Sequence, residues 1–259
     1  MLGTLAGVAR SCSRRGPARH GRRLRRAFLA LVVGAVASCG TGAAAPPDGT
    51  TTTTTVRSVP AVVDGALRAA VPPPPEPRTG ALEHEVLLYG DSVAVLIADE
   101  LAVAVDAPLV VDAVDCRRLD AGFSGPCGGV PAGVDVASGV DALGAAVDAL
   151  DDPARAVAVV SIANNAALHP DDLTAAMAAL GPLPRVWWLT TRVEGRDWQD
   201  PNNQLLVQLA EVDPRAGVID WFAASDDRGW LVDNVHPGDE GQEALAELVA
   251  AHLRCDCTP

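Results

Sequence analysis

The sequence predicts a three-layer α/β/α fold built on a five-stranded parallel sheet. Five short apolar runs of the buried-strand kind alternate along the chain with five stretches of helical periodicity. Strands that alternate with helices form parallel sheets, with helices covering both faces. The apolar runs are continuous rather than alternating, which is typical of strands buried on both faces. In such sheets, functional residues are expected beyond the carboxyl ends of the strands.

Each predicted element is bounded by a change in this pattern. The expected strands cover residues 85–89, 107–112, 155–162, 185–190 and 216–221. The expected helices cover residues 93–103, 134–150, 171–180, 202–212 and 237–254. Residues 116–131 are rich in glycine and contain two cysteines, so they are expected to form a loop between the second strand and the second helix.

The length and composition indicate one domain of catalytic size, which is expected to cover residues 81–259. The chain has 259 residues, of which 49% are hydrophobic and 20% are charged, enough to bury one sizeable core. Eight of its 20 basic residues precede residue 39, whereas 33 residues are acidic. The remaining chain is therefore strongly acidic. This argues against nucleic acid as a partner, because phosphate binding needs clustered basic side chains.

Residues 1–38 have the features of a lipoprotein-type signal peptide. A region of eight arginines precedes an apolar run at residues 27–37, which is too short to span a bilayer comfortably. Residues 36–39, Val-Ala-Ser-Cys, resemble a bacterial lipobox, in which the cysteine is lipidated. A lipidated Cys39 would anchor the protein to the outer face of the cell membrane, whereas an ordinary signal peptide would leave it secreted. The pair Arg25 and Arg26 also resembles a twin-arginine signal, so the export route stays open.

Residues 39–80 are expected to form a disordered tether. Residues 50–55 are all threonine and residues 72–75 are all proline. A stretch of this composition has no apolar periodicity and cannot repay its ordering entropy. It would hold a folded domain away from the membrane while keeping it nearby.

The first candidate functional motif is Gly90-Asp91-Ser92, at the end of the first predicted strand. Glycine permits a tight backbone there. The following helix would direct free N–H groups toward negative charge that develops beside Ser92. These features suit a nucleophilic serine, and the alternative is a simple turn in which Asp91 or Ser92 caps the helix.

The second candidate motif places Asp233 three residues before His236, just ahead of the last predicted helix. A carboxylate at this spacing can accept the Nδ1 proton, which leaves Nε2 free to take a proton from a serine hydroxyl. Among the five histidines, only His236 has an acidic residue three positions earlier. The alternative is that both residues cap the final helix and brace a loop.

The third candidate motif is the pair Asn164 and Asn165, after the third predicted strand. An amide side chain at this place could donate a hydrogen bond to a tetrahedral oxyanion. The alternative is a turn that ends the strand.

Together, these motifs resemble the blocks of the SGNH hydrolase superfamily, also called GDSL-type esterases. The Gly-Asp-Ser motif resembles the first block, which carries the nucleophile, and residues 233–237 resemble the last block, which carries acid and base. The resemblance covers about residues 84–254. It implies a flavodoxin-like three-layer fold, with Ser92 as nucleophile, His236 as base and Asp233 as the acid that orients the base.

The resemblance also implies an oxyanion hole that uses an amide and a glycine. Aligning residues 162–165 with the family's Leu-Gly-Thr-Asn places the catalytic amide at Asn165, with Asn164 as a secondary candidate. The same alignment places Ala163 where the family has glycine. Gly122 is the candidate for the glycine of the family's second block.

The function implied is an exported serine esterase or O-acyltransferase that acts on small acyl esters, such as acetyl esters of cell-envelope carbohydrate. Asp112 and Arg117 are similar to residues of exported SGNH domains that are fused to, or partnered with, membrane O-acyltransferases. Such a membrane protein is therefore a candidate partner, and no cofactor or metal is expected. The alternative from another class is a catalytically silent SGNH-like lipoprotein that binds envelope glycan or a partner protein.

The cysteines that remain after export and lipidation are expected to form disulfides. They are Cys116, Cys127, Cys255 and Cys257. Three pairings are possible, and a local Cys116–Cys127 bridge would leave the other two in a tight ring, so cross-pairing stays open. A zinc site is the rival, although the usual Cys-x-x-Cys spacing is absent from the sequence.

Overall fold

The computed structural model describes residues 82–255, with side chains to residue 254. The predicted signal peptide, the Cys39 anchor and the tether lie outside the described residues, as do Cys257 and the side chain of Cys255. Within the described range, no helix is both long and apolar enough to cross a bilayer.

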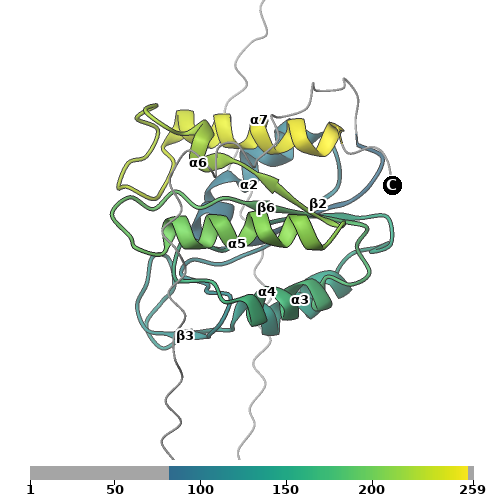
Figure 1. Cartoon of the computed structure of the whole chain (residues 1–259), viewed down its shortest axis with the longest axis horizontal. Coiled ribbons are helices and arrows are strands. Elements are labelled where there is room, and N and C mark those ends of the chain that lie inside the picture. The colour runs from purple at the N-terminus through teal and green to yellow at the C-terminus, as the bar shows by residue number, and fades with distance from the viewer. Residues whose placement is uncertain (1–81, 256–259) are drawn as a thin grey trace, which may run out of the picture. The chain divides into compact units, whose positions relative to one another are not determined.

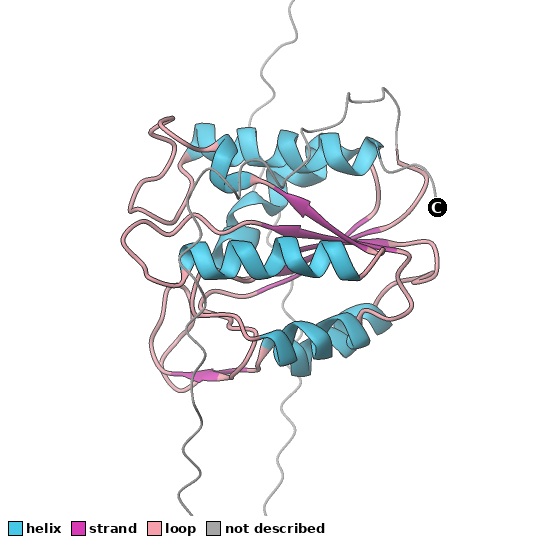
Figure 2. Cartoon of the chain, viewed as in Figure 1, coloured by secondary structure: helices cyan, strands magenta, loops and turns pink. Residues whose placement is uncertain are grey.

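The centre of the fold is a parallel sheet of five strands, as predicted (Figures 1 and 2). Its strands lie in the order β2-β1-β5-β6-β7. Their bounds are β1 Val86–Gly90, β2 Leu109–Ala113, β5 Val157–Ser161, β6 Arg185–Leu189 and β7 Ala216–Ile219. The chain leaves β1 toward β2 on one side and returns to β5 on the other, so the strand order reverses beside β1. Ligands of open α/β sheets bind at such a switch point, beyond the carboxyl ends of the strands.

Helices cover both faces of the sheet (Figure 1). On one face lie α2 (Ser92–Val105) and α7 (Asp239–Cys255), which share a buried cluster that includes Ile97 and Val249. On the other face lie α3 (Gly139–Asp148), α4 (Pro170–Ala179) and α5 (Gln199–Val212). The predicted three-layer α/β/α fold is therefore confirmed.

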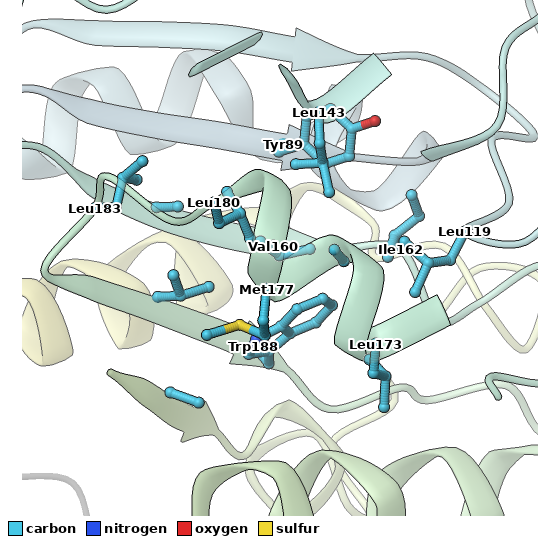
Figure 3. Packing of buried hydrophobic residues seen from close by; sticks show 14 of the residues in the cluster. Tyr89, Leu119, Leu143, Val160, Ile162, Leu173, Met177, Leu180, Leu183 and Trp188 are labelled. Carbon is cyan, nitrogen blue, oxygen red and sulfur yellow. The ribbon is translucent and has the colours of Figure 1, made fainter. Parts of the chain in front are cut away.

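The residues of the central strands contribute alternately to these two clusters, which explains why these strands are apolar on both faces. In β1, Leu87 and Tyr89 face the cluster under α3, α4 and α5, whereas Val86 and Leu88 face the cluster under α2 and α7. All four side chains are fully buried. Figure 3 shows the first cluster, where Trp188 of β6 packs beside residues of α4.

The second predicted helix begins later than expected. Residues 135–136 form strand β4 (Asp135–Val136), which pairs antiparallel with β3 (Phe123–Ser124) in a separate two-stranded sheet. Helix α3 then starts at Gly139, because the Ser138 hydroxyl accepts a hydrogen bond from the Asp141 N–H and caps it. The prediction of a helix from residue 134, and of a loop without strands at 116–131, was wrong at these points. A short helix, α6 (Trp221–Ala224), was also missed.

The disulfide pairing that the sequence left open is settled for two cysteines. Cys116 and Cys127 are joined, with their Cα atoms 6.1 Å apart. Because these two thiols are bonded to each other, they cannot serve as zinc ligands in this state.

Candidate active site

Ser92 is placed by a close crossing of backbone at the end of β1. A Cβ atom on Gly90 would overlap the carbonyl oxygen of Ser161 on the neighbouring strand, so glycine is required there. The next residue, Asp91, donates its N–H to the same carbonyl at 2.8 Å. The Asp91 side chain caps α2 by accepting from the Val93 N–H at 3.1 Å. Ser92 is consequently the first residue of α2, half-buried at the rim of the sheet.

The hydroxyl of Ser92 lies within hydrogen-bond reach of His236, although 144 positions separate the two in the chain. The Ser92 Oγ to His236 Nε2 distance is 2.8 Å, and the His236 Nδ1 to Asp233 Oδ2 distance is 2.7 Å. Hydrogen bonds from the imidazole and the backbone N–H of His236 hold the pKa of Asp233 below its ordinary value. An ionised Asp233 can only accept, so Nδ1 carries the proton and Nε2 of the neutral ring can accept from the serine.

The loop that carries Asp233 and His236 is held in shape by its own backbone. Val232 donates its N–H to the His236 carbonyl at 2.9 Å. Asn234 has a left-handed φ of 69°, which turns the chain between Asp233 and His236. The Glu194 N–H, in the loop after β6, donates to the Asn234 carbonyl at 2.9 Å. The loop is thus braced from a neighbouring strand end.

Asp91 is the buried polar centre next to the serine. Its carboxylate accepts from the Asn164 side-chain nitrogen at 3.0 and 3.1 Å and from the Asn164 backbone N–H at 3.3 Å, in addition to the Val93 N–H. Complete burial raises the pKa of Asp91 from 3.8 to about 6, although these hydrogen bonds and the nearby His236 act in the opposite direction. The four donated hydrogen bonds compensate for burying the ionised form.

Both the nitrogen and the oxygen of the Asn164 side-chain amide make hydrogen bonds within this buried network. While its nitrogen faces Asp91, its Oδ1 accepts from the Thr191 hydroxyl at 2.5 Å. Thr191 is in turn held by Asn203, whose amide accepts from the Thr191 N–H at 2.7 Å and donates to the Thr191 carbonyl at 3.0 Å. All four residues are buried.

Asn165 has a different environment from its neighbour. Its Nδ2 donates to the carbonyl oxygen of Arg117 at 3.1 Å, and the residue is half-buried. An amide nitrogen has two N–H groups, so this bond leaves a second donor. The arrangement is compatible with the predicted oxyanion role of Asn165, which stays a prediction.

Gly122 lies just before β3, and a Cβ atom there would come within 2.9 Å of the Val136 carbonyl oxygen. The β3–β4 pairing therefore explains this glycine by itself, and its oxyanion role also stays a prediction. Asp112 and Arg117 are brought together: the guanidinium donates to the carbonyl and to the Oδ1 of Asp112, both at 2.8 Å.

Sequence reasoning missed the supporting network of Thr191, Asn202 and Asn203. Asn202, at 0% exposure, donates to the carbonyls of Ala163 and Ala166, both at 2.9 Å. The available signal was a pair of amides inside an otherwise apolar helical face, in the stretch predicted as a helix from residue 202. Polar residues are rarely found in such a face unless they are hydrogen-bonded.

No family model matches the chain, and no curated protein sequence matches it. Solved structures do show similarity. The C-terminal catalytic domain of Streptococcus pneumoniae peptidoglycan O-acetyltransferase A, with a methylsulfonyl adduct, is 16% identical, with 68% of this chain and 95% of that chain covered and a TM-score of 0.48. A lipolytic G-D-S-L protein from Veillonella parvula is 16% identical, with coverages of 64% and 96% and a TM-score of 0.47. A Corynascus thermopiles carbohydrate esterase family 2 enzyme is 16% identical, with coverages of 69% and 68% and a TM-score of 0.45.

The chain is thus a three-layer α/β/α protein in which a serine, a histidine and an aspartate meet at the switch point of the sheet. The Gly-Asp-Ser motif lies at the carboxyl end of β1, and residues 233–237 follow β7 in the chain, which agrees with the expectation from a parallel sheet.

Proposed function

We propose that this chain is a serine hydrolase or O-acyltransferase of the SGNH type, acting on small acyl esters. The observation that carries the proposal is the continuous hydrogen-bonded line from Ser92 through His236 to Asp233, with distances of 2.8 and 2.7 Å. Both distances lie within the reach that proton transfer requires. A structural pair that only braced a loop would not need a serine hydroxyl at Nε2.

In this mechanism, Ser92 Oγ attacks the ester carbonyl while His236 Nε2 takes the hydroxyl proton. Asp233 holds the imidazole in the correct tautomer and stabilises the positive charge that forms on it. The backbone N–H of Ser92, at the start of α2, and the amide of Asn165 stabilise the oxyanion. His236 then returns the proton to the leaving alkoxide, and an acyl group remains on Ser92.

The second half of the reaction decides between hydrolysis and transfer. Attack by water would release the acid, whereas attack by a sugar hydroxyl would produce a new ester. Either water or a sugar hydroxyl could reach the site, because the His236 and Asp233 side chains are 33% and 55% exposed. The signal-like leader and the predicted lipid anchor favour a substrate in the cell envelope, and the SGNH resemblance favours an acylated carbohydrate. A membrane O-acyltransferase would be a suitable source of acyl groups.

The purified protein should hydrolyse a simple acetyl ester, and the Ser92→Ala variant should not. Ser124→Ala serves as the matched control, because Ser124 is exposed on β3 and outside the hydrogen-bonded line. Adding an acetylatable oligosaccharide would show transfer as an acetylated product. If the parent protein and both variants are equally inactive toward esters while the fold is intact, the catalytically silent binding protein is the better interpretation, with Ala163 in place of the block glycine as its support.

A further inference from the structure

The loop after β2 begins against the same strand end that carries the candidate nucleophile. The Val114 N–H donates to the carbonyl oxygen of Gly90 at 3.1 Å. The chain then turns back, because the Arg117 N–H donates to the Val114 carbonyl at 3.2 Å. Residues 114–117 therefore form a compact turn that is fixed to the end of β1, two residues from Ser92.

The Cys116–Cys127 disulfide holds this turn from outside. Cys116 has a left-handed φ of 63°, a conformation that residues other than glycine adopt rarely and keep only where the surrounding structure imposes it. The bridge ties Cys116 to the Cys127–Val130 segment, where the Val130 N–H donates to the Cys127 carbonyl at 2.9 Å. The Asp115 carboxylate also accepts from the Gly129 N–H. The backbone just before Arg117 is thus fixed by a covalent link.

The Arg117 side chain holds the turn from inside. It is only 5% exposed, and its guanidinium carbon lies 4.7 Å from the centre of the Tyr89 ring. Its two terminal nitrogens donate to the carbonyl and the carboxylate of Asp112, both at 2.8 Å. A planar, forked and buried guanidinium of this kind leaves the residue little rotational freedom.

Both constraints converge on one atom, the carbonyl oxygen of Arg117. That oxygen accepts from Asn165 Nδ2 at 3.1 Å. Because an amide group is planar, a fixed acceptor for one of its N–H groups determines where the other N–H points. The donor available to an oxyanion at Ser92 therefore depends on the geometry of a turn in a different part of the sequence.

We propose that the Cys116–Cys127 disulfide and the Arg117 guanidinium are positioning elements that aim the Asn165 amide at the oxyanion. This proposal rests on the proposed function and deepens it. Neither element takes part in the Ser92–His236 hydrogen bond. Their loss should therefore reduce the chemical step, because oxyanion stabilisation requires a donor that is already in place.

The test is a double-mutant cycle on the full-length protein with an acetyl ester as substrate. Asn165→Ala should reduce kcat by about 10²- to 10³-fold. Arg117→Met and Cys116→Ala/Cys127→Ala should each reduce kcat by at least about 10-fold, and by no more than Asn165→Ala does. KM and the pH midpoint of turnover should be unchanged. In the Asn165→Ala background, the Arg117 and cysteine changes should alter kcat by less than about twofold, because their effect passes through the removed amide.

Two controls separate positioning from a general loss of structure. Active-site titration with a fluorophosphonate gives kcat per reactive serine, so a misfolded fraction does not count. Arg118→Met removes a neighbouring arginine whose side chain pairs with Asp120, outside the Ser92–His236–Asp233 line, and it should leave kcat unchanged. If the cysteine variant does not fold, the double-mutant cycle of Arg117→Met with Asn165→Ala tests the proposal without it.

Independent effects of Arg117→Met and Asn165→Ala on kcat would overturn the positioning role of Arg117. If Arg117→Met multiplies with Asn165→Ala, raises KM, or leaves kcat unchanged in an active parent protein, the Arg117 turn does not aim the amide. A parent protein with no turnover and no reactive Ser92 would instead overturn the proposed function, and this inference with it.

Discussion

The side-chain nitrogen of Asn164 donates to both carboxylate oxygens of Asp91, at 3.0 and 3.1 Å, where both residues are buried. Asp91 caps α2 and directly precedes Ser92. The hydrogen-bonded pair therefore links the strand end that carries the candidate nucleophile to the strand end that carries the predicted oxyanion amide. It also separates the roles of two adjacent asparagines, since only Asn165 has a donor outside this buried network.

Asn164→Ala and Asn165→Ala should affect different properties. Asn164→Ala leaves the buried Asp91 carboxylate without its side-chain donor, and it should lower the free energy of unfolding by about 3 kcal/mol. Asn165→Ala should change stability little and reduce kcat by about 10²- to 10³-fold. Urea unfolding and steady-state kinetics measure the two effects. A large kcat loss in a well-folded Asn164→Ala protein, with a small one in Asn165→Ala, would place the oxyanion amide at Asn164.

The buried Asp91 should make stability fall with rising pH in a defined window. Its pKa is about 6 in the folded protein against an ordinary 3.8, so the folded state binds this proton more tightly. The contribution is complete below pH about 4 and is lost as the pH rises through about 6, a change of about 3 kcal/mol. Asp91→Asn keeps a capping side chain and should remove this dependence.

The measurement is the difference in unfolding free energy between the parent protein and Asp91→Asn at pH 4 to 7. Asp213 and Asp233 have pKa values lowered by hydrogen bonds from Arg215 and His236, so they act in the opposite direction. Both are present in the two proteins, and their effects cancel in the difference. A difference that does not vary with pH would contradict the account of Asp91.

The three residues of the hydrogen-bonded line should behave as a unit. Ser92→Ala and His236→Ala should each remove nearly all turnover, and the double variant should lose little more. Asp233→Asn should cost less than the roughly 10⁴-fold seen where the orienting carboxylate is buried, because the Asp233 side chain is 55% exposed. Initial rates with an acetyl ester test this. Losses that multiply in the double variant would mean that Ser92 and His236 act separately.

Cys39 should carry the membrane anchor, because it ends a small-residue stretch after the apolar leader and precedes the predicted tether. Cys39→Ala should move the protein from the membrane fraction to the soluble exported fraction, which immunoblotting of fractionated cells would reveal. Cys12→Ala is the control, since Cys12 lies within the predicted signal peptide. Unchanged membrane retention of the Cys39 variant would argue against lipidation there.

The strands β1, β5, β6 and β7 could be predicted because each is an almost wholly buried apolar run, whereas the edge strand β2 is only partly buried. Val86 to Tyr89 and Val157 to Val160 are examples in which every side chain is buried. The β3–β4 pair could not be predicted in this way, because each strand has two residues and exists only through its partner. The start of α3 could have been predicted from Ser138, because serine is a favourable N-cap residue and Asp141 follows three positions later.

The three side chains that meet in the candidate site could be predicted from the sequence, but the residues that support them could not. Ser92, Asp233 and His236 are marked by residue type and local spacing. Thr191, Asn203 and the Arg117 carbonyl act through contacts between distant parts of the chain, which no local pattern encodes. The choice between Asn164 and Asn165 likewise depends on which amide the buried Asp91 engages.

Covalent labelling distinguishes a Ser92 nucleophile that is activated by His236 from an unreactive serine. A fluorophosphonate reacts with activated serines, and peptide mass spectrometry locates the adduct. We predict one adduct, on Ser92. It should form readily in the parent protein and at least about 10²-fold more slowly in His236→Ala. An unlabelled Ser92 in the folded parent protein, or equal labelling rates in the parent and His236→Ala, would contradict this prediction.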